Sequence, residues 1–228
     1  MPTALNYLSP AWQEWYLHRR TLEGFFDSRD AFLVEVDRLR RALAGHDADA
    51  AAHSERVCRF AMAVADELGL DPSTRDQLRV AATLHDVGKL GIPAAILHKA
   101  GDLAPEELAW LRDHVLVGER LVRSLTPAPA VHEAVRWHHE RHDGLGYPDG
   151  LGGDEIPVLT RILAVAEAFA AMTEAGPSGG ALPWADAVGT LHRESGRQFH
   201  PEAVADFVAA LRRVRPDAEG WSRPALRK

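Results

Sequence analysis

The sequence predicts an all-α protein. Apolar residues recur at the spacing of an α-helix in one segment after another, and proline or glycine separates most of these segments. No stretch shows the convincing alternation of a strand, and no internal repeat is visible. At 228 residues, the chain is long enough for one sizeable core, or for one domain with an extension.

Composition excludes several classes of protein. The formal net charge of −7 argues against a nucleic-acid polymer as partner. The single cysteine, Cys58, excludes an internal disulfide and a cysteine-based metal cluster. No apolar run approaches the length of a membrane span, and the N-terminus lacks the pattern of a signal peptide. We therefore expect a cytoplasmic protein that does not associate with a membrane.

Residues 1–45 predict an N-terminal helical extension of two helices. Pro10 opens the first helix, which carries an aromatic face. The second helix has one apolar stripe, made of Phe32, Val36, Leu39 and Leu43. This stripe packs either against the main domain or in an interface, such as a homodimer through the N-terminal helices or the remnant of a sensory module. The sequence leaves both alternatives open.

The main domain is expected over residues 46–213. Its predicted helices cover approximately residues 49–69, 72–87, 105–124, 130–139, 158–173, 184–195 and 201–213. Gly69 and Gly88 end the first two of these helices, and Pro105 begins the third. The polar residues 214–228 are expected to form a loose tail.

Histidine is the outlier of the composition, with 12 residues, and its placement indicates a metal site. Several helices each place histidine on the face that should be buried, with carboxylates at Asp86 and Glu167 nearby. These histidines are His53, His85, His114, His138 and His139. One such histidine is usually a structural core residue, but five together need partners for their ring nitrogens in an apolar setting. Imidazole with carboxylate and no thiolate suits Fe, Mn or Zn.

A glycine-rich, acidic loop follows the histidine pair and ends near Pro157. Its glycines are Gly144, Gly146, Gly150, Gly152 and Gly153. Because glycine loses more backbone freedom than any other residue on folding, such a loop is costly to order. Long loops inside compact chains are usually functional or disordered, and the flanking histidines favour a functional one.

Two motifs resemble a known family. The run from His138 to Pro148, His-His-Glu-Arg-His-Asp-Gly-Leu-Gly-Tyr-Pro, resembles the signature of the HD-GYP proteins, a branch of the HD metal-dependent phosphohydrolases. The segment His-Asp-Val-Gly-Lys at 85–89 resembles the His-Asp-x-Gly-Lys element of the same superfamily. The likeness covers roughly residues 42–211, and it implies an all-helical HD-domain bundle.

The resemblance also implies roles for individual residues. The implied metal ligands are His53, His85, Asp86, His114, His138, His139 and Glu167, with Asp49 as a carboxylate for a third ion. Asp86 would bridge two ions at the catalytic centre. Lys89 would contact phosphate or position the nucleophile, although a solvated cation is also favourable at a helix end. The loop residues that shape the substrate side would be Asp143, Gly144, Gly146, Tyr147 and Pro148. Two or three divalent metal ions are implied, with Fe or Mn favoured over Zn.

The implied function is a phosphodiesterase that uses metal-activated water to open cyclic di-GMP to pGpG, and onward to GMP. Three departures leave alternatives open. The family usually has Asp where this chain has Glu167, a second Asp at Ala170, and an arginine-containing segment where residues 174–180 read Glu-Ala-Gly-Pro-Ser-Gly-Gly. The first alternative is a weak or inactive domain that acts as a cyclic-dinucleotide receptor or protein-interaction module. The second is a phosphohydrolase acting on another cyclic dinucleotide or nucleotide.

Overall fold

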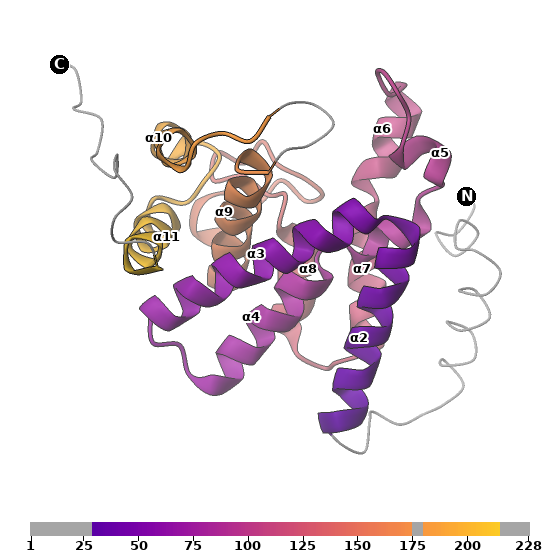
Figure 1. The fold of residues 1–228 in the computed structure, drawn as a ribbon, viewed down its shortest axis with the longest axis horizontal. Coiled ribbons are helices and arrows are strands. Elements are labelled where there is room, and N and C mark those ends of the chain that lie inside the picture. The colour runs from indigo at the N-terminus through magenta and orange to yellow at the C-terminus, as the bar shows by residue number, and fades with distance from the viewer. Residues whose placement is uncertain (1–28, 175–179, 215–228) are drawn as a thin grey trace.

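The computed structural model describes residues 29–174 and 180–214 (Figure 1). These residues form helices joined by turns and loops, without a strand beyond one isolated bridge between Ser195 and Phe199. The all-α prediction is therefore confirmed. The elements are α2 (Arg29–His46), α3 (Ala48–Glu67), α4 (Pro72–Leu84), η2 (Val87–Gly91), α5 (Ala94–Leu97), α6 (Pro105–Arg112), α7 (His114–Arg123), α8 (Pro129–Trp137), η3 (Gly153–Glu155), α9 (Val158–Met172), α10 (Trp184–Glu194) and α11 (Pro201–Val214).

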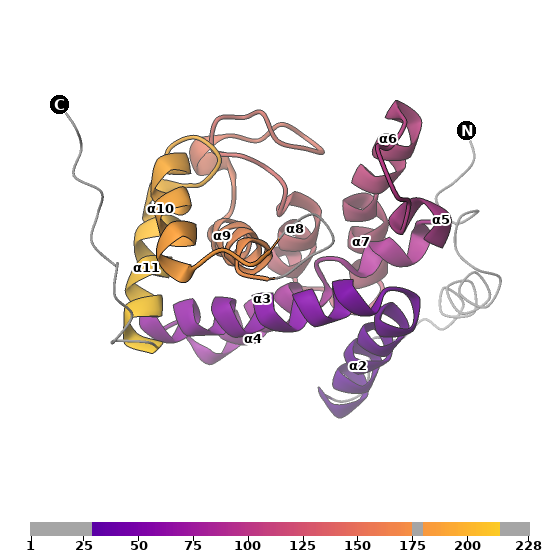
Figure 2. The same ribbon diagram turned by 45° about the horizontal axis from the view of Figure 1, so that its top comes forward.

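Helix α3 is the central element of the bundle. It lies across the molecule, with α10 and α11 near one of its ends and α5 and α6 near the other (Figures 1 and 2). It packs against α2, α4, α9 and α11. The helix begins where the Asp47 side chain accepts a hydrogen bond from Ala50 N at 2.9 Å, which satisfies one of the unpaired N–H groups of the first turn. His53 follows one turn later, on the edge of the buried face.

An aromatic cluster fixes α3 against the C-terminal helices. Phe60 of α3 and Phe207 of α11 lie with their ring centroids 5.0 and 5.1 Å from that of Phe169 in α9. Trp184, at the start of α10, adds a fourth ring 5.3 Å from Phe169. Phe169 is fully buried. Aromatic pairs at these spacings stabilise beyond their burial alone, so the cluster holds α3 and α9 in register.

The apolar stripe of α2 packs against the bundle. Leu39 and Leu43 are almost completely buried, and α2 contacts α3, α4 and η2. For this helix the structure supports the first alternative, packing against the main domain. The predicted helix at Pro10 and the tail beyond residue 214 lie outside the described residues, so the homodimer and both domain boundaries stay predictions. Within the described ranges no helix is both long and apolar enough to cross a bilayer.

The single helix predicted over residues 105–124 is wrong in one respect. It is divided into α6 and α7 at Asp113. The His114 ring lies 2.6 Å from Leu111 O, the carbonyl that an uninterrupted helix would pair with Val115 N–H. The apolar periodicity continues through the break, which is why the sequence does not reveal it. The division makes His114 the first residue of a new helix.

Two glycines allow η2, α7 and α8 to approach closely. A Cβ atom at Gly88 would overlap the backbone of His114 and lie 2.6 Å from Gly118 N. A Cβ at Gly118 would lie 3.0 Å from the side chain of Val135 in α8. Because backbone cannot move aside as a flexible side chain can, position 88 accepts only glycine. The contact places Asp86 and Lys89, on either side of Gly88, against the start of α7.

We expect Gly88→Ala to destabilise the fold by roughly 3 kcal/mol, because the added methyl group forces η2 away from α7. The measurement is urea unfolding of the metal-free protein, which excludes any effect of metal binding. Gly45→Ala is the control. A Cβ atom at this position meets no atom within 4 Å, and the substitution removes a glycine from inside a helix. Equal stability of the Gly88→Ala variant and the wild type would contradict the close-contact explanation.

Candidate metal centre

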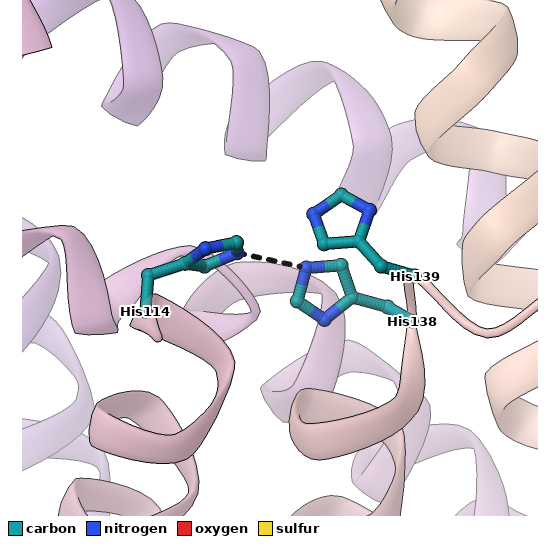
Figure 3. A group of neighbouring side chains, drawn as sticks. All are labelled: His114, His138 and His139. Atoms are coloured by element: carbon teal, nitrogen blue, oxygen red, sulfur yellow. Dashed lines mark hydrogen bonds between the residues drawn. The ribbon is translucent and has the colours of Figure 1, made fainter. Parts of the chain in front are cut away.

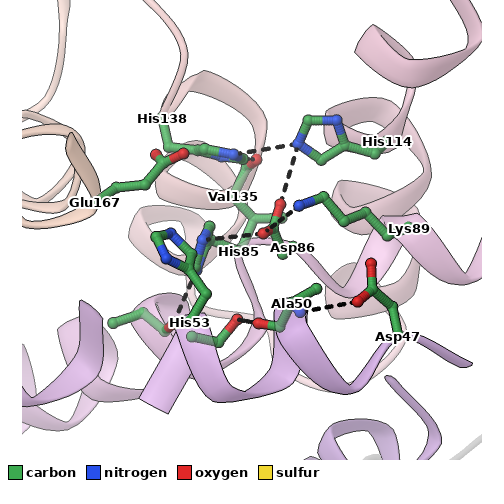
Figure 4. Close-up of polar contacts among 12 residues, drawn as sticks. Asp47, Ala50, His53, His85, Asp86, Lys89, His114, Val135, His138 and Glu167 are labelled. Atoms are coloured by element: carbon green, nitrogen blue, oxygen red, sulfur yellow. Dashed lines mark hydrogen bonds and ion pairs between the residues drawn. The ribbon is translucent and has the colours of Figure 1, made fainter. Parts of the chain in front are cut away.

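The predicted histidines and carboxylates come together between the helices (Figure 4). They form two groups of three residues, and within each group the possible ligand atoms lie within 4.8 Å of one another. The first group is His114, His138 and His139, and the second is His53, His85 and Glu167. The first group comes from α7 and the end of α8 (Figure 3). The second comes from α3, the end of α4 and α9.

Three of the histidines use carbonyl groups at helix ends to fix their rings. The last turn of a helix leaves its carbonyls without partners, and each ring takes the carbonyl three residues before it. The Nδ1–O distances are 2.9 Å from His85 to Ala82, 2.6 Å from His114 to Leu111 and 2.8 Å from His138 to Val135. A carbonyl can only accept, so Nδ1 carries the proton and the neutral ring presents a lone pair on Nε2.

These Nε2 lone pairs face acceptors instead of donors. His114 Nε2 and His138 Nε2 lie 3.3 Å apart (Figure 3). His85 Nε2 is buried and has no hydrogen-bond partner among the described residues. A buried nitrogen without a partner costs about 1–3 kcal/mol, and two opposed lone pairs repel each other. Divalent cations held by the two groups would satisfy all three nitrogens, so the donor set fits a metal centre.

Asp86 lies between the two groups. Its Oδ2 is 3.5 Å from His85 Nε2 in one group, and its Oδ1 is 3.4 Å from His114 Nε2 in the other. Burial acts to raise the pKa of this carboxyl, but Lys89 and the surrounding imidazoles outweigh burial and hold the pKa well below its usual range. Asp86 is therefore an ionised carboxylate with one oxygen directed toward each group, as a bridging ligand requires.

Lys89 belongs to the cluster and is not a solvated cation at a helix end. Its side chain is only 23% exposed, and its Nζ lies 2.7 Å from Asp86 Oδ2. Burial acts to lower the pKa of the ammonium group, but the contact with Asp86 raises it overall. Lys89 thus stays charged beside the metal-ligand candidates, where it can donate to an anionic ligand.

The remaining candidates differ in their protonation. Burial lowers the pKa of His53 to about 4 and that of His139 to about 3, so both imidazoles are neutral at pH 7. Burial, reinforced by Asp86, raises the pKa of Glu167 to about 8. His139 Nδ1 lies 3.9 Å from Glu167 Oε1. Glu167 thus approaches His139 of the first group, while its ligand atom lies within 4.8 Å of those of His53 and His85 in the second.

Asp49 is the one predicted ligand that the structure does not bring to the cluster. Its side chain is exposed on α3, and it belongs to neither group. Glu174, to which sequence analysis gave no role, approaches instead. Glu174 Oε2 lies 3.4 Å from His53 Nδ1, and Oε1 forms an ion pair with Arg56. Arg56 lies one turn after His53 on α3, but no pattern in the sequence points from these residues to Glu174.

Two of the predicted loop residues, Gly146 and Tyr147, lie beside the cluster. Tyr147 stacks on His139, with ring centroids 4.9 Å apart and planes inclined by 28°. Gly144 has a positive φ of 73°, and a Cβ at Gly146 would lie 2.5 Å from the backbone of Arg141. Both turns therefore need glycine. Asp143 pairs with Arg141 at 2.6 Å, and Pro148 follows Tyr147 through a cis peptide bond.

Two acidic residues that sequence analysis did not single out hold the loop in place. Buried Glu140 accepts hydrogen bonds from Asp149 N at 2.7 Å and Gly150 N at 3.0 Å. The Asp149 carboxylate in turn accepts two hydrogen bonds from Arg136, at 2.7 and 2.9 Å, and one from Trp137 at 2.6 Å. The loop is thus fixed to α8, which also supports His138.

A pocket of about 370 Å³ opens beside the cluster. His138, His139 and Glu167 of the cluster line it, and Tyr147 and Arg112 also contribute to its wall. The pocket thus gives a small-molecule ligand direct access to the first group of histidines. Its lining mixes imidazole, carboxylate, guanidinium and aromatic groups, a combination that suits a polar, anionic ligand with flat rings.

A model of the HD domain matches residues 37–203. The chain belongs to the HD domain family. It is 36% identical over 206 residues to a cyclic di-GMP phosphodiesterase of Thermotoga maritima, covering 89% of this chain and 56% of that protein. It is 36% identical over 193 residues to the cyclic di-GMP phosphodiesterase response regulator RpfG of Xanthomonas campestris, covering 82% of this chain and 50% of that protein. The chain thus spans about half the length of these relatives.

Solved structures confirm the fold. The HD-GYP protein Bd1817 of Bdellovibrio bacteriovorus superposes with a TM-score of 0.58 at 18% identity, over 92% of this chain and 69% of that one. The HD domain of the phosphodiesterase PgpH of L. monocytogenes, in complex with cyclic di-AMP, gives a TM-score of 0.57 at 16% identity, over 78% of this chain and 97% of that domain. The HD-domain bundle and the resemblance to HD-GYP proteins are therefore confirmed.

Acidification should destabilise the metal-free protein. In the unfolded chain histidine binds its proton near pH 6.5, whereas His53 and His139 in the folded chain bind theirs only near pH 4 and 3. Between these values the unfolded state binds more protons at these two residues, so their contribution to stability falls as the pH falls, whereas Glu167, with its pKa raised to about 8, contributes in the opposite direction. Removing one buried imidazole by His139→Gln should reduce the loss between pH 7.5 and 5 by roughly 1–2 kcal/mol.

The measurement is urea unfolding of the chelator-treated wild type and His139→Gln at both pH values. His98→Gln is the control, because it removes an imidazole from the surface and should keep the wild-type profile. If His139→Gln lost as much stability as the wild type, the neutral state of the buried imidazole would be refuted.

Proposed function

We propose that the chain is a metal-dependent phosphodiesterase that hydrolyses cyclic di-GMP to pGpG and onward to GMP. One observation gives this proposal its main support. Three buried imidazoles present Nε2 lone pairs to one another and to the ionised Asp86, beside a pocket of about 370 Å³. The names of the Thermotoga and Xanthomonas relatives support the substrate class.

In this proposal each group of three residues would hold one divalent metal ion, with Asp86 as a ligand shared between them. The two groups and the exposed position of Asp49 favour two ions over three. Imidazole and carboxylate without thiolate suit Fe or Mn, which we favour over Zn. Bound there, the ions would supply Lewis acidity and a water of lowered pKa.

The chain's own residues would bind and orient the substrate. Lys89 keeps its charge and donates from Nζ, close to Asp86, to a phosphodiester oxygen. Tyr147, stacked on His139, offers a flat apolar wall for a base or ribose. The buried positions of His85, His114 and His138 exclude bulk water from the inner side of the cluster.

Glu174 favours a second candidate function, a weak or inactive domain that acts as a protein-interaction module rather than as a cyclic-dinucleotide receptor. Its carboxylate faces His53 and neutralises Arg56, at the start of the segment where the family carries arginine. A negative charge there would oppose an incoming phosphate. A third candidate is the hydrolysis of another cyclic dinucleotide, since a 37% identical relative of Vibrio cholerae is named as specific for 3′3′-cGAMP.

The deciding experiment combines metal analysis with turnover on one sample. The protein is purified anaerobically, its Fe, Mn and Zn are quantified, and cyclic di-GMP, 3′3′-cGAMP and cyclic di-AMP are each supplied as substrate. Two metal ions per chain with pGpG production would support the proposed function. Metal without turnover and without cyclic di-GMP binding would favour the interaction module, and cyclic di-GMP binding without turnover would favour a receptor. The absence of metal would refute the metal centre and the phosphodiesterase functions built on it.

Two substitutions should separate metal binding from substrate binding. Asp86→Asn should lose metal and activity together, because it removes the charge that the two groups share. Lys89→Gln should keep its metal and lower kcat by roughly 100-fold or more, because a charged donor to the phosphate is lost. Lys99→Gln, at a surface lysine paired with Glu107, is the control with the same change in charge. Normal turnover by Lys89→Gln would show that its role is wrongly assigned.

A further inference from the structure

Arg112 is an exposed cation of the pocket wall. It is the last residue of α6, and its side chain lies over the Tyr147 ring with Cζ 5.2 Å from the ring centroid. Tyr147 in turn stacks on His139 at 4.9 Å. Three planar groups therefore lead outward from the metal centre along the pocket wall. A cation over an aromatic face is attracted by the ring, which holds Arg112 in this position.

The other arginines near the site are already paired. Arg141 makes two hydrogen bonds to the Asp143 carboxylate, at 2.9 and 2.6 Å. Arg56 forms its ion pair with Glu174. Arg112, by contrast, has no carboxylate partner anywhere in residues 29–174 and 180–214. It is therefore the arginine of the pocket wall that remains available to an anionic ligand.

The chemistry of a guanidinium group suits a phosphodiester. When its charge is held over a ring, its N–H donors remain free at the edge of the group. Two parallel donors match two oxygens of a phosphate and give a charge-assisted, bidentate contact. Lys89, the other cation of the site, is held at Asp86 in the cluster. The two cations are thus held at different places, Lys89 on Asp86 and Arg112 over Tyr147.

We propose that Arg112 binds the second phosphodiester of a cyclic dinucleotide while the first lies at the metal centre. This inference rests on the proposed function, because it needs a ligand with two phosphodiesters in one ring. It assigns to α6 a contact that residues 174–180, which contain no arginine, cannot supply. Arg112 is thus a residue that determines affinity for cyclic substrates over those with a single phosphodiester.

The test compares Arg112→Gln with the wild type, both as metal-loaded full-length chains. Binding is measured by calorimetry with phosphorothioate analogues, which resist hydrolysis, of cyclic di-GMP and of the linear dinucleotide GpG. Losing one charge-assisted contact should weaken binding of the cyclic analogue by about 10- to 100-fold. Binding of the GpG analogue, which has one phosphodiester, should weaken by less than about threefold. Arg120→Gln, at an exposed arginine of α7, is the charge-matched control.

The outcomes distinguish this inference from the proposed function. Equal weakening of the cyclic and linear analogues would overturn it. The inference would also be overturned if Arg112→Gln weakened binding of the cyclic di-GMP analogue but not of the cyclic di-AMP analogue, because Arg112 would then recognise the guanine edge. A wild type that binds no cyclic dinucleotide would overturn both proposals. Selective loss of cyclic-analogue binding in a protein without turnover would support the role of Arg112 and refute the phosphodiesterase.

Discussion

The hydrogen bonds from His85, His114 and His138 to helix-end carbonyls are the interactions on which the site depends. Each bond fixes a ring orientation and a tautomer in one step, and it uses an oxygen that the helix itself leaves unpaired. The helix boundaries are therefore part of the site, because a helix that continued by one turn would claim the same carbonyl. The division between α6 and α7 at Asp113 is the clearest example of this dependence.

Sequence periodicity predicted the all-α class and the buried faces that carry the histidines, because both follow from contacts within one helix. It did not predict the break at Asp113, where the apolar stripe continues while the backbone is set by η2 crossing at Gly88. Asp49, one turn before His53, has an exposed side chain on α3, and its role as the ligand of a third ion stays a prediction.

The contacts that sequence analysis missed are those between separate elements. Glu140 bonds to the backbone of Asp149, and Glu174 meets Arg56 across more than one hundred residues of chain. Neither has a periodic signal, since an acidic residue in a loop or at a helix end is ordinary. Such hydrogen-bond and ion-pair partners can be recognised only when the positions of the helices are known. Here the aromatic contacts around Phe169 set those positions.

The anchored loop has a thermodynamic consequence for recognition. If the loop became ordered only when a ligand bound, its glycines would lose conformational entropy at that step, and binding would be weaker. Instead, Glu140 and Arg136 fix one side of it, and His142 N and Asp143 N donate to the carbonyls of residues 198 and 197 on the other, at 3.1 and 2.8 Å. The conformational freedom is lost during folding, so the wall that Tyr147 provides is preorganised and binding carries little further ordering cost.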